Sequence, residues 1–220
     1  MSSGTGTIDQ RPRQMFQILL DAYGPQSWWP ADSVAETVVG AILTQNTAWS
    51  NVEKALEVLR REKLLDVHRL AGVDTGQLAK CIRSSGYYNQ KAGRLQDFCR
   101  RLEREHGSLD TLQTLSTDEL RGWLLDIRGI GKETADSMLL YAFNRPIFVV
   151  DAYTIRIFSR HNLVDKKSGY DQVQNYIHAN LEPDVRTYNE FHALLVRTGK
   201  ECCKRKNPRC DVCPLADFYN

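Results

Sequence analysis

The sequence predicts an all-α fold, and two observations carry this prediction. Apolar residues recur at spacings of three and four along most of the 220 residues, which is the period of an amphipathic helix. The segments between these runs are short, hold turn-forming residues such as Gly, Pro and Asn, and include no convincing strand. We therefore expect roughly ten helices joined by short turns, packed around a full hydrophobic core.

The first elements follow from the same pattern. Residues 1–12 are rich in Ser, Gly and Thr and are expected to form a flexible tail. A helix with apolar residues at positions 15, 18, 19 and 23 should end at Gly24-Pro25. Asp32 or Ser33 can cap the next helix, which should end near Leu43.

The stretch from Ile127 to Asp136 is the most informative in the chain. Gly129 and Gly131 flank one apolar residue between two helical patterns, which predicts a helix-hairpin-helix over about residues 120–143. Glycine allows the backbone N–H groups to approach a ligand closely, and a helix N-terminus favours an anion. The natural anion is a nucleic-acid phosphate, and an ordinary turn between two helices is the alternative.

Composition limits the classes of function. The net charge is only +2, so a nucleic-acid interface must come from local patches rather than from the bulk charge. No apolar run approaches the roughly 18 residues of a membrane span, and the N-terminus lacks the apolar core of a signal peptide. Of the six cysteines, four lie within residues 202–213. This clustering predicts a metal site in a cytoplasmic protein rather than a disulfide framework.

A short apolar run, Pro146 to Val150, leads to Asp151 about twenty residues after the hairpin. Together with the hairpin, this pattern resembles the helix-hairpin-helix (HhH-GPD) DNA glycosylases of the endonuclease III superfamily, over roughly residues 15 to 218. The resemblance implies a two-lobed all-α fold with the DNA in the cleft between the lobes. One six-helix lobe would span 26–145, and a second helical lobe would combine 13–25 with 146–220 and carry a Cys-rich loop at 202–213.

The resemblance also implies roles for individual residues. Asp151 becomes the catalytic carboxylate, which stabilises the oxocarbenium charge or orients the attacking water, although an Asp at this place can also be an ordinary helix cap. Arg156 is one plausible partner for it. Gln45 would enter the duplex where a base is flipped out, or simply cap a helix, and Tyr87 would wedge into the base stack. The DNA-contacting set is Gln45, Tyr87, Gly129, Gly131, Lys132 and Thr134.

Two features narrow the resemblance to one branch. The position that holds the Schiff-base lysine in endonuclease III is Glu133 here, so we expect a monofunctional enzyme without lyase activity. The segments Trp28-Trp29-Pro30, Leu43 to Thr47 and Gly86 to Ala92 look like those of the 3-methyladenine DNA glycosylases. Trp28 or Trp29, with Trp49, would sandwich a cationic methylated base by stacking and cation–π attraction.

The Cys-rich loop matches the iron–sulfur loop of the superfamily in part. Cys203, Cys210 and Cys213 have the spacing of three ligands of its [4Fe-4S] cluster, but Tyr219 stands at the fourth. Either Cys202 or another group completes the set, or the cluster is weak or lost. Five basic residues suit this region to the DNA backbone, or form a solvated surface: Lys200, Lys204, Arg205, Lys206 and Arg209.

The sequence therefore predicts a monofunctional base excision repair glycosylase. It should act as a monomer on double-stranded DNA containing a damaged base, removing alkylated bases such as 3-methyladenine by hydrolysis of the N-glycosidic bond. Two alternatives stay open. One is an endonuclease III-like glycosylase for oxidised pyrimidines or mismatched thymine, and the other is a non-catalytic DNA-binding iron–sulfur protein.

Overall fold

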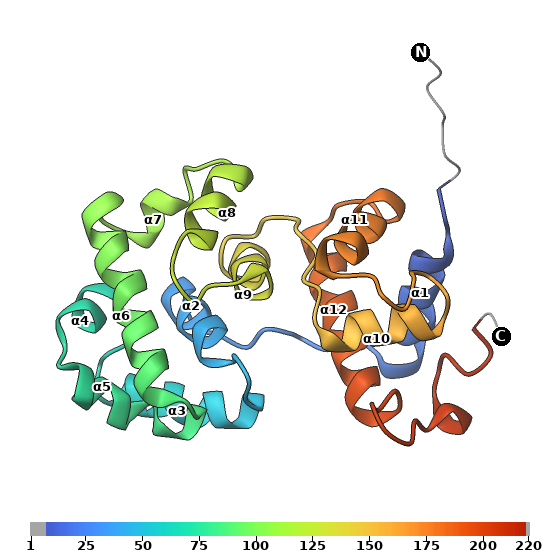
Figure 1. Ribbon diagram of the computed structural model, residues 1–220, viewed down its shortest axis with the longest axis horizontal. Helices are drawn as coiled ribbons and strands as arrows, with labels where there is room; N and C mark the ends of the chain where they lie inside the picture. The colour runs from blue at the N-terminus through green and yellow to red at the C-terminus, as the bar shows by residue number, and fades with distance from the viewer. Residues whose placement is uncertain (1–7, 219–220) are drawn as a thin grey trace, which may run out of the picture. The chain divides into compact units, whose positions relative to one another are not determined.

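The computed structural model describes residues 8–218 and is helical throughout (Figure 1). These residues contain α-helices, short 3-10 turns and one π-helical turn, and no β-strand. The prediction of an all-α fold is confirmed. Within the same residues, no helix is long and apolar enough to cross a membrane.

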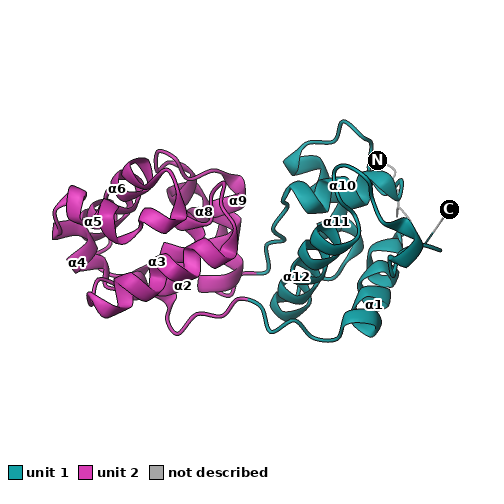
Figure 2. Cartoon of the chain, turned by 90° about the horizontal axis from the view of Figure 1, so that it is seen from below, with its two compact units in different colours: residues 1–28, 146–220 teal, residues 29–145 magenta. Residues whose placement is uncertain are grey.

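The chain divides into two compact units, coloured separately in Figure 2. Unit 1 combines residues 1–28 with 146–220 and unit 2 is residues 29–145. In unit 1, α12 packs against both α1 and α10. Buried aromatic residues fill its core, where the ring of Phe191 meets Phe16 and Phe148. The helices of unit 1 are α1 (Arg11–Tyr23), α10 (Ala152–Arg160), α11 (Tyr170–Asn180), α12 (Val185–Glu201) and the 3-10 turn η3 (Cys210–Val212).

Unit 2 is built around its longest helix, α6, which packs against α4 and α5. The helix α2 is apolar almost all round and is nearly all buried, because α3, α6 and η2 all pack against it. The elements of unit 2 are α2 (Val34–Leu43), α3 (Trp49–Arg61), α4 (Val67–Gly72), α5 (Thr75–Cys81), η1 (Arg83–Ser85), α6 (Tyr88–Glu105), α7 (Leu109–Leu112), α8 (Thr117–Leu125), α9 (Lys132–Ser137) and the π-helical turn η2 (Met138–Ala142).

Unit 2 holds eight α-helices where the sequence predicts six. The two additional helices are short, and each begins at its own side-chain cap: Asp66 for α4 and Ser108 for α7. Helices of this length are too short to show an apolar period in the sequence, so local capping is their main signal. A capping box of Ser116 and Glu119, whose Ser-x-x-Glu pattern is visible in the sequence, begins α8.

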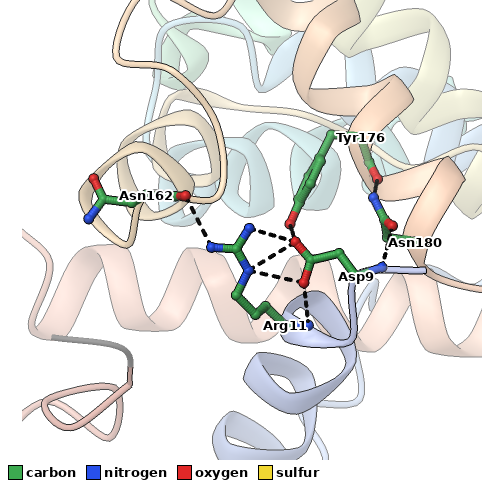
Figure 3. Close-up of polar contacts among 5 residues, drawn as sticks. All are labelled: Asp9, Arg11, Asn162, Tyr176 and Asn180. Carbon is green, nitrogen blue, oxygen red and sulfur yellow. Dashed lines mark hydrogen bonds and ion pairs between the residues drawn. The ribbon is translucent and has the colours of Figure 1, made fainter. Parts of the chain in front are cut away.

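The predicted tail of residues 1–12 is wrong at its inner end, where Asp9 anchors the start of α1 (Figure 3). The Asp9 carboxylate accepts hydrogen bonds from Arg11 (Nη2, 2.6 Å) and from the Tyr176 hydroxyl (2.6 Å). The Asp9 N–H donates to Asn180 Oδ1 at 2.8 Å, and Arg11 Nη1 donates to the Asn162 carbonyl at 3.2 Å. Polar side chains thus fix the chain from Asp9 onward, and residues 1–7 of that prediction lie outside the described residues.

The Asp9 cluster gives a prediction about stability and pH. Hydrogen bonds from Arg11 lower the pKa of Asp9 far below its ordinary value, against the effect of burial and with a further contribution from Tyr176. We expect Asp9→Asn to reduce the free energy of unfolding by about 1–2 kcal/mol at pH 7. A carboxylate with a lowered folded-state pKa stabilises the fold above its unfolded pKa of about 4, and this contribution disappears on further acidification.

Urea melts of both proteins from pH 7 to pH 3 measure this difference. The matched control is Asp21→Asn, which removes a carboxylate that receives one exposed hydrogen bond from Gln17 on α1, and it should change stability little. An Asp9→Asn deficit that stays constant down to pH 3 would show that the charge of Asp9 is not what stabilises the cluster.

Candidate functional site

The predicted hairpin is present in unit 2, between α8 and α9. The residue before α9, Gly131, has an extended backbone with φ of −94°, whereas Gly129 has φ of +88°, a conformation that favours glycine. The two helices are also joined by an ion pair, because Arg121 Nε donates at 2.7 Å to the fully buried carboxylate of Asp136. The hairpin is therefore fixed both by its turn and by a buried contact between its helices.

Gln45 reaches the hairpin from the turn that follows α2. Its Nε2 donates to the Gly129 carbonyl at 3.0 Å and to the Thr134 hydroxyl at 3.1 Å, although Gln45 and Gly129 are 84 residues apart. Arg94 donates to the other end of the Gln45 amide, Oε1. A surface pocket of about 380 Å³ lies here, lined by Ala41, Thr44, Gln45, Asn46, Arg94, Gly129, Gly131, Glu133, Thr134 and Ser137.

A buried lysine connects the turn that carries Gln45 to the turn that carries Tyr87, the predicted wedge. Lys91 is 1% exposed, and its Nζ donates to the carbonyl of Leu43 at 2.8 Å and to that of Ser85 at 2.6 Å. Burial and the nearby charge of Arg94 lower the pKa of Lys91 to about 8. Leu43 lies two residues before Gln45 and Ser85 two before Tyr87, so one ammonium group fixes both turns.

Tyr87 stands out on the surface of unit 2. It is 68% exposed, and its φ of +46° places it in the left-handed region, just before α6 begins. A large aromatic side chain in that conformation costs about 1–3 kcal/mol of backbone strain. A large exposed ring next to the start of α6 suits the predicted wedge, which stays a prediction. Lys132 is exposed at the start of α9, between Gly131 and Glu133, which line the pocket beside Gln45.

The predicted base-stacking tryptophans are divided between the units. In unit 2, Trp29 stacks on Tyr141, with centroids 4.9 Å apart, and meets Trp49 edge to face at 4.6 Å. Gly40 makes room for them, because a Cβ there would lie 3.2 Å from Trp29. In unit 1, Lys200 lies 5.9 Å over the ring of Trp28. A base can enter between Trp29 and Trp49 only if these two indoles part.

Asp151 in unit 1 is the N-cap of α10 and also lies close to a histidine on another helix. Its Oδ1 accepts from the backbone N–H of Thr154 at 2.7 Å and from the Thr154 hydroxyl at 3.0 Å. Its Oδ2 lies 3.6 Å from Nε2 of His192 on α12, an ion-pair separation when the imidazole is protonated. The Asp151 side chain is only 11% exposed, so one oxygen serves the cap and the second faces His192.

Competing effects set the pKa of Asp151. Burial raises it, but His192 and the two bonds from Thr154 outweigh burial and hold the pKa of Asp151 below its ordinary value. The group is therefore a carboxylate at neutral pH, able to stabilise a developing positive charge or to orient a water molecule. Arg156, which the sequence suggested as its partner, instead donates to the carbonyls of Cys203 and Gly199.

The Cys-rich loop of unit 1 gathers its thiols around one cavity of about 130 Å³. Cys202, Cys203, Cys210 and Cys213 all line it, and none of them forms a disulfide. Arg160 Nη1 donates to the Cys203 sulfur at 3.2 Å. In residues 8–218, no three His, Cys, Asp or Glu side chains form a group that could hold a single metal ion. Four thiols on one cavity nevertheless supply the donor set of an iron–sulfur cluster. Tyr219 lies outside the described residues.

Three residues of this site escaped the sequence reading. Arg94 lies one turn beyond Lys91 on α6, and this spacing of two cations on one helix face is the signal that could have revealed it. His192 lies inside an otherwise apolar stretch of α12 and is buried. Tyr141 lies in η2 and stacks on Trp29, a residue far from it in the sequence, so no local pattern indicates this contact.

Comparison with known protein families gives two matches. Residues 39–183 match the family described as HhH-GPD superfamily base excision DNA repair protein. Residues 203–218 match the iron-sulfur binding domain of endonuclease III. A protein of Methanocaldococcus jannaschii, provisionally named a DNA repair glycosylase, is 46% identical over 207 residues, which cover 93% of this chain and 94% of that protein.

Solved structures agree with the fold. The H. pylori 3-methyladenine DNA glycosylase (MagIII) bound to 1,N6-ethenoadenine has a TM-score of 0.74 and 29% identity, and the match covers 86% of this chain and 97% of that one. A trapped endonuclease III–DNA covalent intermediate has a TM-score of 0.80 over 94% of this chain and 93% of that one. Its identity is 22%, so it is similar in fold alone.

The two hairpin glycines should respond differently to alanine. At Gly129 a Cβ would lie 2.5 Å from Arg94 Nε and 2.8 Å from its Cδ, and φ is positive. At Gly131 the space around a Cβ is open. We expect Gly129→Ala to lower the free energy of unfolding by about 1–3 kcal/mol and Gly131→Ala to change it by less than about 0.5 kcal/mol. Chemical denaturation of both variants measures this, and equal losses would contradict the strained geometry of Gly129.

Proposed function

Because the chain belongs to the HhH-GPD superfamily of base excision DNA repair proteins, we propose that it is a monofunctional DNA glycosylase for alkylated bases such as 3-methyladenine. One observation carries the proposal: Asp151 is a nearly buried carboxylate with a lowered pKa and a histidine partner.

Asp151 acts on the sugar. Cleavage of the N-glycosidic bond leaves positive charge on the deoxyribose, and a fixed carboxylate in a poorly solvated place stabilises that charge strongly. The Thr154 bonds hold one oxygen, which leaves Oδ2 as the atom that faces the reaction. His192 keeps the carboxylate ionised and in position. Water then attacks the sugar, and the released base carries away the bonding electron pair.

The chemistry of the leaving group favours an alkylated base. A purine methylated at N3 is cationic and departs as a neutral base, so a strong general acid is not required. Electron-rich indole faces attract a cationic ring, a contact worth about 0.5–2 kcal/mol. Trp28, Trp29 and Trp49 are the proposed stacking residues, and the likeness to the H. pylori 3-methyladenine DNA glycosylase supports this choice.

The absence of a lyase step follows from the hairpin. The second residue after Gly131 is Glu133, whose carboxylate cannot form a Schiff base with the abasic sugar. Lys132 precedes it and lies at a different angle around α9. The product is therefore intact abasic DNA.

The proposed DNA contacts lie in unit 2. Backbone N–H groups of the hairpin, with Lys132 beside them, bind phosphate. Gln45 occupies the space that a flipped base leaves, and Tyr87 inserts into the stack next to it. The partner is double-stranded DNA with a damaged base, bound by a monomer.

The Cys-rich loop is proposed to hold a [4Fe-4S] cluster, for which the family match over residues 203–218 is the support. Cys203, Cys210 and Cys213 would be ligands, and Cys202, which lines the same cavity, would supply the fourth thiolate. In this position the cluster would be structural, fixing the loop after α12 and its basic residues.

The first experiment compares Asp151→Asn with Asp184→Asn on methylated duplex DNA. Asp184 caps α12 through the Thr187 N–H at 2.7 Å, so this control changes the same kind of cap away from the site. We expect wild type and Asp184→Asn to release 3-methyladenine and to leave the strand intact. Asp151→Asn should bind DNA but lose at least about 100-fold in single-turnover rate. Chromatography of the bases and a gel for strand nicks provide the measurements.

Each contrary result has a definite meaning. Normal turnover by Asp151→Asn would refute the catalytic role of this carboxylate. If wild type releases oxidised pyrimidines or mismatched thymine and no methylated base, the proposed substrate is wrong. Nicks that accompany base release after stringent purification would refute the monofunctional assignment.

The cluster has a separate test that does not use activity. Anaerobically purified wild type should contain roughly four irons per chain and absorb visible light. Single Ser variants of Cys203, Cys210 and Cys213 should lose that iron, and Cys202→Ser should lose part of it, whereas Cys81→Ser, on α5 in the other unit, should lose none. If wild type contains no iron when purified anaerobically, and is as thermally stable as the Cys→Ser variants, the proposed cofactor is contradicted.

A further inference from the structure

Arg94 lies at the meeting point of three segments of unit 2. It comes from α6, and its guanidinium donates to Oε1 of Gln45, on the turn after α2. Its side chain covers Gly129 so closely that a Cβ there would force Arg94 to move. Arg94 therefore contacts the predicted base-replacing residue and the hairpin at the same time.

The Gln45 amide has little hydrogen-bonding capacity left in this arrangement. Both Nε2 hydrogens are used, one by the Gly129 carbonyl and one by the Thr134 hydroxyl. One lone pair of Oε1 accepts from Arg94. An amide that donates both hydrogens to the hairpin and accepts from a cation has only one orientation, because a flipped amide would place an NH₂ group against the guanidinium.

The hydrogen bond to Gln45 is the main polar interaction of Arg94. Within residues 8–218 it forms no ion pair, and its single hydrogen bond goes to Gln45. A half-buried guanidinium beside an open polar pocket has five N–H donors, and one of them determines how Gln45 lies. Arg94 is one of the residues that line this pocket.

We propose that Arg94 is a positioning residue that orients Gln45 on the hairpin before DNA binds. The inference rests on the proposed function in one respect, namely that this face of unit 2 receives DNA. A glutamine side chain has three flexible torsions, and ordering it costs free energy. With Arg94 present, that cost is met in the free protein rather than during binding. A direct contact of Arg94 with a DNA phosphate is the competing explanation.

A double-mutant cycle separates the two explanations. Binding of wild type, Arg94→Ala, Gln45→Ala and the double variant is measured on a duplex with a tetrahydrofuran abasic analogue, which needs no base release. Immobilising one such side chain corresponds to roughly a fivefold change in Kd. We expect Arg94→Ala to weaken binding by about this factor in wild type and to have almost no effect once Gln45 is alanine. Arg94→Lys, which keeps a donor, should recover part of the loss.

The control and the contrary outcomes are equally definite. Arg100→Ala removes another arginine of α6, which donates to the Ala71 carbonyl, and it should leave binding unchanged. An equal loss from Arg94→Ala in both backgrounds, with a smaller dependence of Kd on salt, would show a phosphate contact and overturn the proposal. Wild-type affinity in Arg94→Ala would also overturn it. If wild type fails to bind the duplex at all, the proposed function itself is wrong, and thermal melts show whether any variant fails to fold.

Discussion

The two turns of unit 2 that carry the proposed DNA contacts Gln45 and Tyr87 are held in place by one buried ammonium group. Lys91 donates to the carbonyls of Leu43 and Ser85, two segments that end just before Gln45 and Tyr87. A buried cation costs several kcal/mol unless hydrogen bonds compensate it, so these carbonyls cannot move away without a large penalty. The ammonium thereby imposes a fixed spacing on two turns that are far apart in the chain.

Polar side chains also hold the hairpin against the turn that carries Gln45. Gln45 is bonded to Gly129 and Thr134, and Arg94 covers Gly129. Three polar side chains therefore join the end of α2, the start of α6 and the hairpin into one surface. A surface with this rigidity suits recognition of a deformed duplex, because the protein does not have to be reorganised when the DNA is.

In unit 1, the structure keeps the carboxylate of Asp151 ionised although the side chain is largely buried. Asp151 serves both as the cap of α10 and as the partner of His192. The cap fixes one oxygen, and the histidine offsets the cost of burial at the other. On the far side of α10, Arg156 and Arg160 bond the carbonyls and the sulfur of the Cys-rich loop, so this loop and the carboxylate are positioned by the same helix.

Much of the fold followed from local sequence patterns. The helices α1 and α2, the hairpin around Gly129 and the capping box at Ser116 depend on residues within one or two turns of each other, and such patterns are visible in the chain itself. The short helices α4 and α7 and the anchored residues after Asp9 were not foreseen. The former span too few residues to show a period, and the latter depend on Tyr176 and Asn180.

The sequence by itself determined the family, the Asp151 and Cys motifs and the presence of Glu133 two residues after Gly131, because each depends on spacing along the chain. Only the tertiary structure decided which groups meet: His192 with Asp151, Arg94 with Gln45, and Tyr141 with Trp29. A side chain's partner is set by packing between elements that are distant in sequence. No periodicity records that packing, and so these contacts could not be predicted from the residues alone.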